Sequence, residues 1–176
     1  KFKIDPIVRI TADCPLIDPK LLNEIIKLFL NNDYDYISNT ITPTFPDGMD
    51  IEIMTFQAVK KAYKKSKKQF DREHVTPFIK KNKDFKKYNY VNKNDLSHFR
   101  LTVDYPEDLV LIKRLVKEFK NSILFSWKEI EKTLISKKDI FYVNNNFERD
   151  EGSNMSSGQK MWKRAKGIIP GGNMLL

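Results

Sequence analysis

The sequence of 176 residues contains a single cysteine, and it has no apolar run that approaches the ~20 residues of a membrane-spanning helix. Cys14 alone cannot form an intrachain disulfide, which is typical of proteins in a reducing compartment. No signal-peptide pattern opens the chain. These absences predict a cytoplasmic protein that has no membrane partner.

Glycine is also scarce, and the glycine motifs that bind phosphates are missing. None of the six glycines belongs to a G-x-x-x-x-G-K-[ST] loop or to a G-x-G-x-x-G turn. The chain has no zinc-finger spacing and no aromatic motif of the RNA-recognition type. Its net charge of +9 comes mostly from lysines in short runs, which are typical of solvated helix faces and would also favour small anionic substrates. The sequence therefore predicts no nucleic-acid partner.

What the chain does contain is one heptapeptide pattern, R-x-T-x-D-x-P, in two distant places. Arg9–Pro15 and Arg100–Pro106 both follow it, with alternating β-formers before the aspartate and a helical pattern after the proline. Side chains alternate along a strand, so the arginine, threonine and aspartate of each motif are expected on one face. Ligands of open α/β sheets bind beyond the carboxyl ends of the strands. We therefore expect Asp13 and Asp104 at the rim of a sheet.

Asp13 and Asp104 are candidate ligands of one divalent cation. Carboxylate oxygens on rigid elements suit magnesium, and phosphoryl or nucleotidyl transfer uses such a cation to neutralise a triphosphate. Either aspartate alone could instead cap the helix that follows or end a strand at a turn, but the matched pair favours the metal. Cys14 is adjacent to Asp13, yet nothing nearby in the sequence would activate it, which favours a small buried thiol over a nucleophile.

Further candidate residues lie between the two motifs. Asp50 and Glu52 alternate with isoleucines and so share one face of a predicted strand. They could bind a hydroxylated substrate, assist at the metal or form a solvated acidic face. Glu73 and His74 lie in a helical region, where a histidine can contact substrate, cap a helix or simply pack.

Hydrophobic periodicity predicts an α/β domain up to about residue 143. The expected strands are a buried one at 7–12 and others at 34–39, 49–54, 86–91 and 98–103. The expected helices are 18–31, 55–67, 70–82, one beginning at Pro106, and 126–136. Asp18 and Thr55 would cap the first two, and Pro77 would interrupt the third. Phe56, Val59 and Tyr63 are expected on the apolar face of 55–67. Residues 144–158 are polar and aperiodic, as in a linker.

Four sequence blocks together resemble a known family. They are Arg9–Pro19, Phe45–Glu52, Glu73–Pro77 and Arg100–Leu109. In this order they are similar to the cytidylyltransferases of surface-sugar biosynthesis, of the spore-coat polysaccharide type related to CMP-Kdo and CMP-sialic acid synthetases. The resemblance implies a nucleotide-diphospho-sugar-transferase α/β fold, Rossmann-like and three-layered.

The same resemblance implies a reaction and its site. A sugar or sugar acid would receive CMP from CTP with release of pyrophosphate, and Asp13 and Asp104 would be the catalytic ligands of Mg²⁺. The two middle blocks would line the pocket of the acceptor sugar, and a homodimer is compatible with such an enzyme. The implied substrate-binding residues are Arg9, Asp47, Gly48, Asp50, Glu52, Glu73, His74 and Arg100.

Both ends of the chain suggest a piece of a longer protein. Members of the family begin with a strand and a glycine-containing loop that grips CTP, whereas this chain opens on Lys1 without them. We therefore expect residues 1–143 to be a cytidylyltransferase domain that is incomplete at its N-terminus and binds CTP poorly alone. Residues 157–172 resemble the start of an aminotransferase of the glutamate-1-semialdehyde-aminomutase type, so 159–176 would open a second domain. Its pyridoxal-phosphate lysine would lie further along.

Two other functions stay open at this point. The domain could be a metal-dependent glycosyltransferase of similar fold, which would use a nucleotide-sugar donor. It could also be a catalytically silent scaffold that positions or dimerises the aminotransferase.

Overall fold

A mixed four-stranded sheet forms the centre of the protein. The computed structural model describes residues 5–120, 125–144, 146, 147 and 149. The strands are β1 (Ile7–Arg9), β2 (Tyr36–Ser38), β3 (Glu52–Met54) and β4 (Lys87–Asn89). Their spatial order is β1-β3-β2-β4, with β3 antiparallel to both β1 and β2 and β4 parallel to β2.

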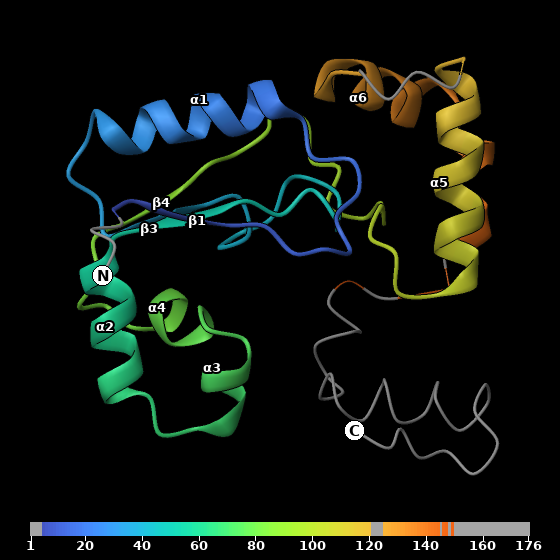
Figure 1. Ribbon diagram of the computed structural model, residues 1–176. Coiled ribbons are helices and arrows are strands. Elements are labelled where there is room, and N and C mark those ends of the chain that lie inside the picture. Colours follow the sequence, from blue (N-terminus) through green and yellow to red (C-terminus); the bar gives the residue numbers. More distant parts are fainter. Residues whose placement is uncertain (1–4, 121–124, 145, 148, 150–176) are drawn as a thin grey trace, which may run out of the picture.

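Helices cover both faces of this sheet (Figure 1). One helix, α1, lies on one face, and α2 to α4 form a lobe on the opposite face, while α5 and α6 lie beyond the end of the strands. The helices are α1 (Pro19–Leu30), α2 (Phe56–Lys65), α3 (Gln69–Glu73), α4 (Pro77–Lys81), α5 (Pro106–Glu118) and α6 (Trp127–Ser136). A 3₁₀ helix, η1 (Lys138–Asn144), packs on α5.

The alternation of side chains along the strands divides the core in two. Ile37 and Ile53 belong to the larger cluster, which α1, α5 and α6 complete. Their strand neighbours Tyr36 and Met54 belong to a second cluster with residues of α2 and α4. Because neighbouring strand residues point to opposite faces, one short sheet supports both cores. The three-layer α/β fold expected from the sequence is confirmed.

Most of the predicted helices form, and local signals fix where they begin. Asp18 caps α1 by accepting a hydrogen bond from the Lys20 amide at 2.7 Å, and its second oxygen accepts from the Trp127 amide at the start of α6 at 2.7 Å. Thr55 caps α2 through the Ala58 amide. The expected interruption at Pro77 is also observed, because α3 ends at Glu73 and α4 begins at Pro77.

Two predicted strands differ from the structure. Residues 98–103 form no strand, and Arg100 makes only an isolated bridge with Asp47. The backbone of this segment bonds to the loops that contain Asp47 and Asp13 instead of joining the sheet. The strand predicted as buried at 7–12 ends at Arg9, and Val8 and Ile10 are exposed. Within the described residues β1 is the last strand of the sheet, and it pairs with β3 alone.

The structure also rules out one alternative left open for Glu52 and corrects the predicted apolar face of α2. The solvated acidic face considered for Glu52 does not form, because β3 is an inner strand with helices above and below, and Glu52 is buried. In α2 the buried residues are Ala58 and Ala62, whereas Phe56 and Tyr63 are exposed. Small residues let a helix lie close to a sheet, and this places the large aromatic side chains on the outside.

None of the helices in the described part of the chain is long and apolar enough to cross a membrane.

Candidate active site

The structure brings the two R-x-T-x-D-x-P motifs into direct contact. The Val103 amide donates to the backbone oxygen of Asp13 at 2.9 Å, and the Thr102 hydroxyl donates to the same oxygen at 3.2 Å. Asp13 lies in a turn after β1, and Asp104 lies just before α5. Two aspartates that are distant in the sequence therefore lie on adjoining turns.

Arg100 is the centre of the charged cluster at these turns. Its side chain is only 5% exposed, and its three nitrogens are shared among three carboxylates. Nη1 lies 3.1 Å from Asp47, Nη2 lies 2.7 Å from Asp104, and Nε lies 3.0 Å from Asp108. Burial lowers the pKa of Arg100, but the hydrogen bonds to Asp108 and Asp104 outweigh it, so the pKa is raised and the guanidinium stays charged.

Asp108 belongs to this cluster but was not among the predicted site residues. It is fully buried and accepts hydrogen bonds from the amides of Asp104 and Tyr105 at 3.0 Å each. Burial raises the pKa of Asp108, but the bonds from Arg100 and Asn144 outweigh it, and the pKa lies below its ordinary value. An acidic residue two places after an N-terminal proline is a capping-box signal, so the sequence did contain a hint.

Asn144, near the C-terminal end of the domain, also contacts the cluster. It is buried, and its amide nitrogen donates to Asp108 at 2.8 Å and to the backbone oxygen of Arg100 at 3.2 Å. Phe147 stacks on Tyr105 with ring centroids 4.3 Å apart. Both residues come from the segment predicted as a linker, and both pack on the site. The remainder of that segment from residue 150, and the predicted aminotransferase start at 159–176, lie outside the described residues.

Gly48 holds two loops together rather than offering a side chain. Its φ is +92°, and a Cβ at this position would lie 2.3 Å from the backbone nitrogen of Thr102. The residue before it makes two backbone hydrogen bonds to the same loop: the Asp47 amide donates to the Phe99 oxygen, and the Leu101 amide donates to the Asp47 oxygen. Only glycine permits both this backbone conformation and this close approach. Gly48 was predicted to bind substrate, but its first role is to let the backbone bring Asp47 into contact with Arg100.

Cys14 and Asp50 lie next to this cluster. The Cys14 sulfur is 3.7 Å from Oδ1 of Asp13 and 3.1 Å from the Thr11 hydroxyl. Burial raises the pKa of Cys14 to about 12, so the thiol stays protonated at neutral pH, and the prediction of a buried thiol is confirmed. Asp50 forms an ion pair with Arg149 at 3.0 Å, another contact from the end of the domain.

Glu52 and Arg9 face the other layer of the protein. Glu52 is 2% exposed and pairs with Arg9 on β1 and with Lys80 at 3.2 Å. It also accepts hydrogen bonds from the hydroxyls of Tyr36 at 2.5 Å and Thr76 at 2.7 Å. Through Lys80 and Thr76, Glu52 joins the α2–α4 lobe to the sheet, which is a structural role that the sequence did not predict.

The charge of Glu52 should make the stability depend on pH. Burial raises the pKa of Glu52, but Lys80, Tyr36 and Arg9 outweigh it and bring the pKa below its ordinary value of 4.5. The unfolded chain therefore takes up the proton first as the pH falls, so the contribution of Glu52 is full well above pH 4.5 and is lost progressively as the pH falls below 4.5 through the lower pKa of the folded state. We expect Glu52→Gln to lower the free energy of unfolding by about 2–3 kcal/mol at pH 7.

Urea denaturation at pH 7 and at pH 3.5 measures this effect. The difference between the wild-type protein and the Glu52→Gln variant should shrink at the lower pH. An equal difference at both values would contradict an ionised Glu52 in the folded state.

Glu73 and His74 lie at the end of α3, away from the motif aspartates in sequence. His74 follows the last helical residue, and its ring lies 4.5 Å from that of Phe70. Glu73 is exposed. The chain connects them to the Glu52 network through Thr76, and their predicted contact with a substrate stays a prediction.

The donor atoms of the site suit magnesium better than a softer metal. Asp13 and Asp104 offer hard carboxylate oxygens on adjoining turns, and magnesium commonly takes one or two carboxylates while water and substrate phosphates complete its shell. Within the described residues no group of three or more His, Cys, Asp or Glu side chains could hold a metal ion by itself. The chemistry of these two side chains is therefore compatible with magnesium, and their role as its ligands stays a prediction.

Fold and site together define a three-layer α/β protein whose acidic site, braced by a buried arginine, lies at the end of a mixed sheet. The chain belongs to the cytidylyltransferase family, because the model of that family, described as Cytidylyltransferase, matches residues 1–150. The resemblance inferred from the four sequence blocks is confirmed at the level of the family.

Individual relatives agree with this assignment. A solved cytidylyltransferase structure from Leptospira borgpetersenii serovar Hardjo-bovis has a TM-score of 0.75 and 37% identity, over 78% of this chain and 59% of that one. An uncharacterized protein of Methanocaldococcus jannaschii is 37% identical over 118 residues, which are 65% of this chain and 47% of that protein. The spore coat polysaccharide biosynthesis protein SpsF of Bacillus subtilis is 28% identical over 64% of this chain and 47% of its own. The chain spans about half the length of these curated relatives.

Proposed function

We propose that the protein containing this chain transfers CMP from CTP to a sugar or sugar acid and releases pyrophosphate. The observation that carries the proposal is the contact between the two motifs, in which the Val103 amide binds the Asp13 backbone oxygen at 2.9 Å. It places two carboxylate-bearing turns side by side in a chain of the cytidylyltransferase family. The name of the B. subtilis relative supports polysaccharide biosynthesis as the setting.

The side chains of the site would have two roles, binding the metal and orienting its ligands. Asp13 and Asp104 would hold Mg²⁺, which when bound neutralises the triphosphate and the charge that develops as pyrophosphate leaves. Arg100 fixes the orientation of Asp104, and Asp108 in turn fixes Arg100. Because these groups are buried and already paired, the site needs little rearrangement when the substrate arrives.

The acceptor sugar would approach from the side of Asp50 and Arg149. Asp50 is half-buried and lies at the edge of the charged cluster, where a carboxylate can accept hydrogen bonds from sugar hydroxyls. The attacking hydroxyl oxygen would form a bond to the α-phosphorus of CTP while the bond to the leaving pyrophosphate breaks. A homodimer remains compatible with this arrangement.

Pyrophosphate release tests the proposal directly. The protein should be assayed together with whatever sequence precedes Lys1 in its reading frame, with CTP, magnesium and a panel of sugars and sugar acids. We expect release that requires magnesium, CTP and one class of acceptor. A glycosyltransferase would release no pyrophosphate from CTP but would consume a nucleotide sugar, and a silent scaffold would do neither; either result would refute the proposal.

A further inference from the structure

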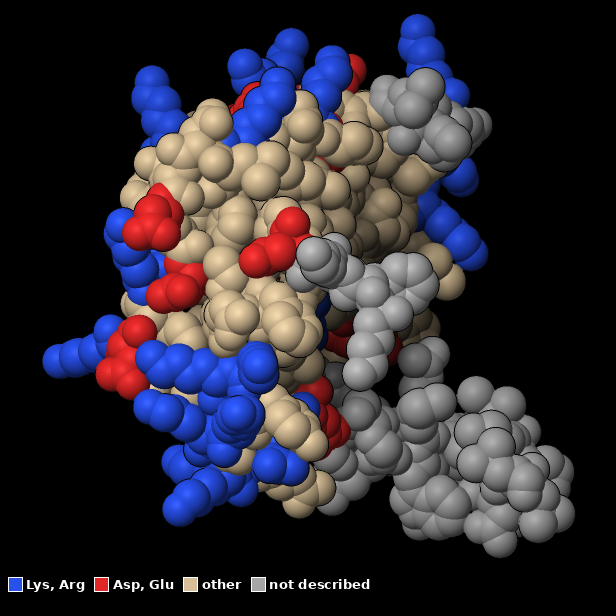
Figure 2. All heavy atoms as spheres, turned by 60° about the vertical axis from the view of Figure 1, so that its left-hand side comes forward, with Lys and Arg blue, Asp and Glu red and all other residues tan. Residues whose placement is uncertain are grey.

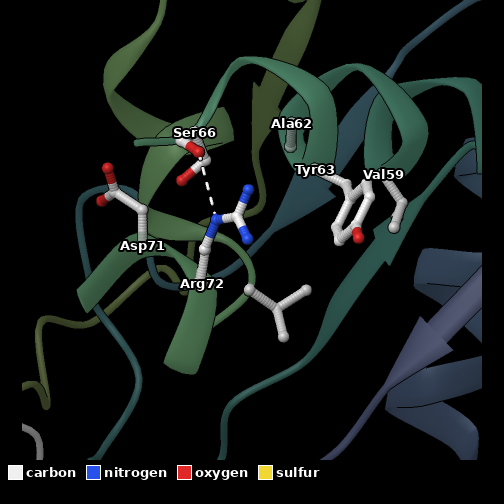
Figure 3. Close-up of a pocket in the computed structure, with 7 residues that line it drawn as sticks. Val59, Ala62, Tyr63, Ser66, Asp71 and Arg72 are labelled. Atoms are coloured by element: carbon white, nitrogen blue, oxygen red, sulfur yellow. Dashed lines mark hydrogen bonds between the residues drawn. The ribbon is translucent and has the colours of Figure 1, made fainter. Parts of the chain in front are cut away.

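A cavity of about 280 Å³ opens in the α2–α4 lobe, on the opposite side of the sheet from α1. Val59, Ala62 and Tyr63 of α2 line it together with Arg72 and Val75. Figure 3 shows Arg72 opposite these residues of α2. The lining is mostly apolar, and none of these side chains belongs to the aspartate site. The cavity is a little smaller than pockets that bind drug-sized molecules, so a small ligand of one or two rings fits its size.

One polar group in this lining lacks a partner. The Oγ atom of Ser66 is buried, and no hydrogen bond to it exists within the described part of the chain. The residue as a whole is 4% exposed, so water does not easily satisfy the hydroxyl. A buried hydroxyl without a partner costs about 1–3 kcal/mol. A ligand atom that accepts or donates a hydrogen bond here would remove that cost.

The surroundings of the cavity favour a ligand with negative charge. Residues 56–81 carry nine of the 32 lysines and arginines but only two of the 23 acidic residues. Figure 2 shows basic side chains gathered on the lower part of the molecule, over this lobe. Within the cavity, the Arg72 guanidinium lies 5.4 Å above the ring of Tyr63, and its Nε donates to the Ser66 backbone oxygen. Figure 3 shows the Asp71 carboxylate turned away from Tyr63 and Val59.

We propose that this cavity binds a small molecule that has an aromatic or aliphatic ring body and one acidic group. The ring would lie against Val59, Ala62 and Tyr63, the acidic group would bind Arg72, and the Ser66 hydroxyl would gain its missing hydrogen bond. A second copy of the chain is a poor occupant, because two lobes with the same large positive charge would repel each other.

The cavity is connected to the sheet through one strained residue. Val75 lines the cavity and has a φ of +67°, which a β-branched residue adopts only under strain. The next residue, Thr76, donates to the buried carboxylate of Glu52, and Glu52 pairs with Arg9 at the start of the first motif. Binding that moves Val75 would therefore also move the Thr76–Glu52 contact.

Two dyes with the same rings test the proposal. 1-Anilinonaphthalene-8-sulfonate carries an acidic group, and N-phenyl-1-naphthylamine lacks it. Fluorescence titration of the folded chain should show tighter binding of the sulfonate. Arg72→Gln should weaken the sulfonate about tenfold, which corresponds to one lost charge-assisted hydrogen bond, and leave the neutral dye unchanged.

Two more variants locate the binding. Lys64→Gln is the matched control, because it removes one positive charge from an exposed position of α2 that does not line the cavity, and it should change neither affinity by more than about twofold. Tyr63→Ala, at a side chain 69% exposed and therefore tolerant of change, should weaken both dyes. Equal effects of Arg72→Gln and Lys64→Gln, or no effect of Tyr63→Ala, would overturn the proposal.

Amide NMR spectra test the connection to Glu52. On saturation with the sulfonate dye, the Val75 and Thr76 signals should shift more than those of α6, which lies at the far end of the sheet. Shifts confined to Tyr63 and Arg72 would show binding without the connection and would overturn that part of the inference.

Discussion

Replacing Arg100 with methionine is expected to lower the free energy of unfolding by about 3–5 kcal/mol. The arginine is the shared partner of Asp47, Asp104 and Asp108, and the Asp108 side chain is fully buried. Methionine fills much of the same volume but leaves these carboxylates without their cation. A buried charge that loses its partner costs far more than the pair contributed to stability, which is why the expected effect is large.

Urea denaturation of the Arg100→Met variant measures this loss. Lys137→Met is the matched control, since it breaks an ion pair with Glu118 in which the lysine is half exposed, and it should change the stability by less than about 1 kcal/mol. The double variant Arg100→Met, Asp108→Asn should lose less stability than the sum of the two single losses, because the second change removes one of the charges that Arg100 would otherwise neutralise. A loss for Arg100→Met no larger than that of the control would contradict the buried cluster.

The sequence predicted local structure well because the signals for it are local. Asp18 and Thr55 lie directly before the helices that they cap, and Pro77 lies at the point where a helix restarts. The R-x-T-x-D-x-P pair was also informative, since two copies of one pattern pointed to two turns that the fold places in contact. Each of these predictions needed only neighbouring residues or a repeated motif.

Burial and partners were predicted less well, because they depend on the order of the strands. Nothing in residues 49–54 indicates that β3 is an inner strand, and so the burial of Glu52 could not be predicted. Asn144 and Arg149 reach the site from beyond the last periodic segment, and their partners Asp108 and Asp50 lie far away in sequence. Such contacts have no local signature.

The second large effect is expected on activity, when Asp13 or Asp104 is replaced, and the two residues differ in their contacts. The Asp13 carboxylate is half-buried and lies next to the Cys14 thiol, whereas Asp104 also pairs with the buried Arg100. We expect both Asp13→Asn and Asp104→Asn to reduce magnesium-dependent pyrophosphate release by at least about a hundredfold, because an amide is a far poorer ligand of Mg²⁺ than a carboxylate. Their stabilities should differ.

The free energy of unfolding of Asp13→Asn should lie within about 1 kcal/mol of the wild-type value. That of Asp104→Asn should be lower by about 1–2 kcal/mol, because Arg100 then faces a neutral amide. Asp33→Asn serves as the control for the same chemical change at a side chain that is 99% exposed.

Magnesium titration by calorimetry, urea denaturation and the pyrophosphate assay would be run on all three variants. If Asp13→Asn binds magnesium and turns over like the control, then Asp13 is not a metal ligand. If Asp104→Asn alone loses activity, and only in proportion to its folded fraction, the role of Asp104 is to hold Arg100 and not the metal.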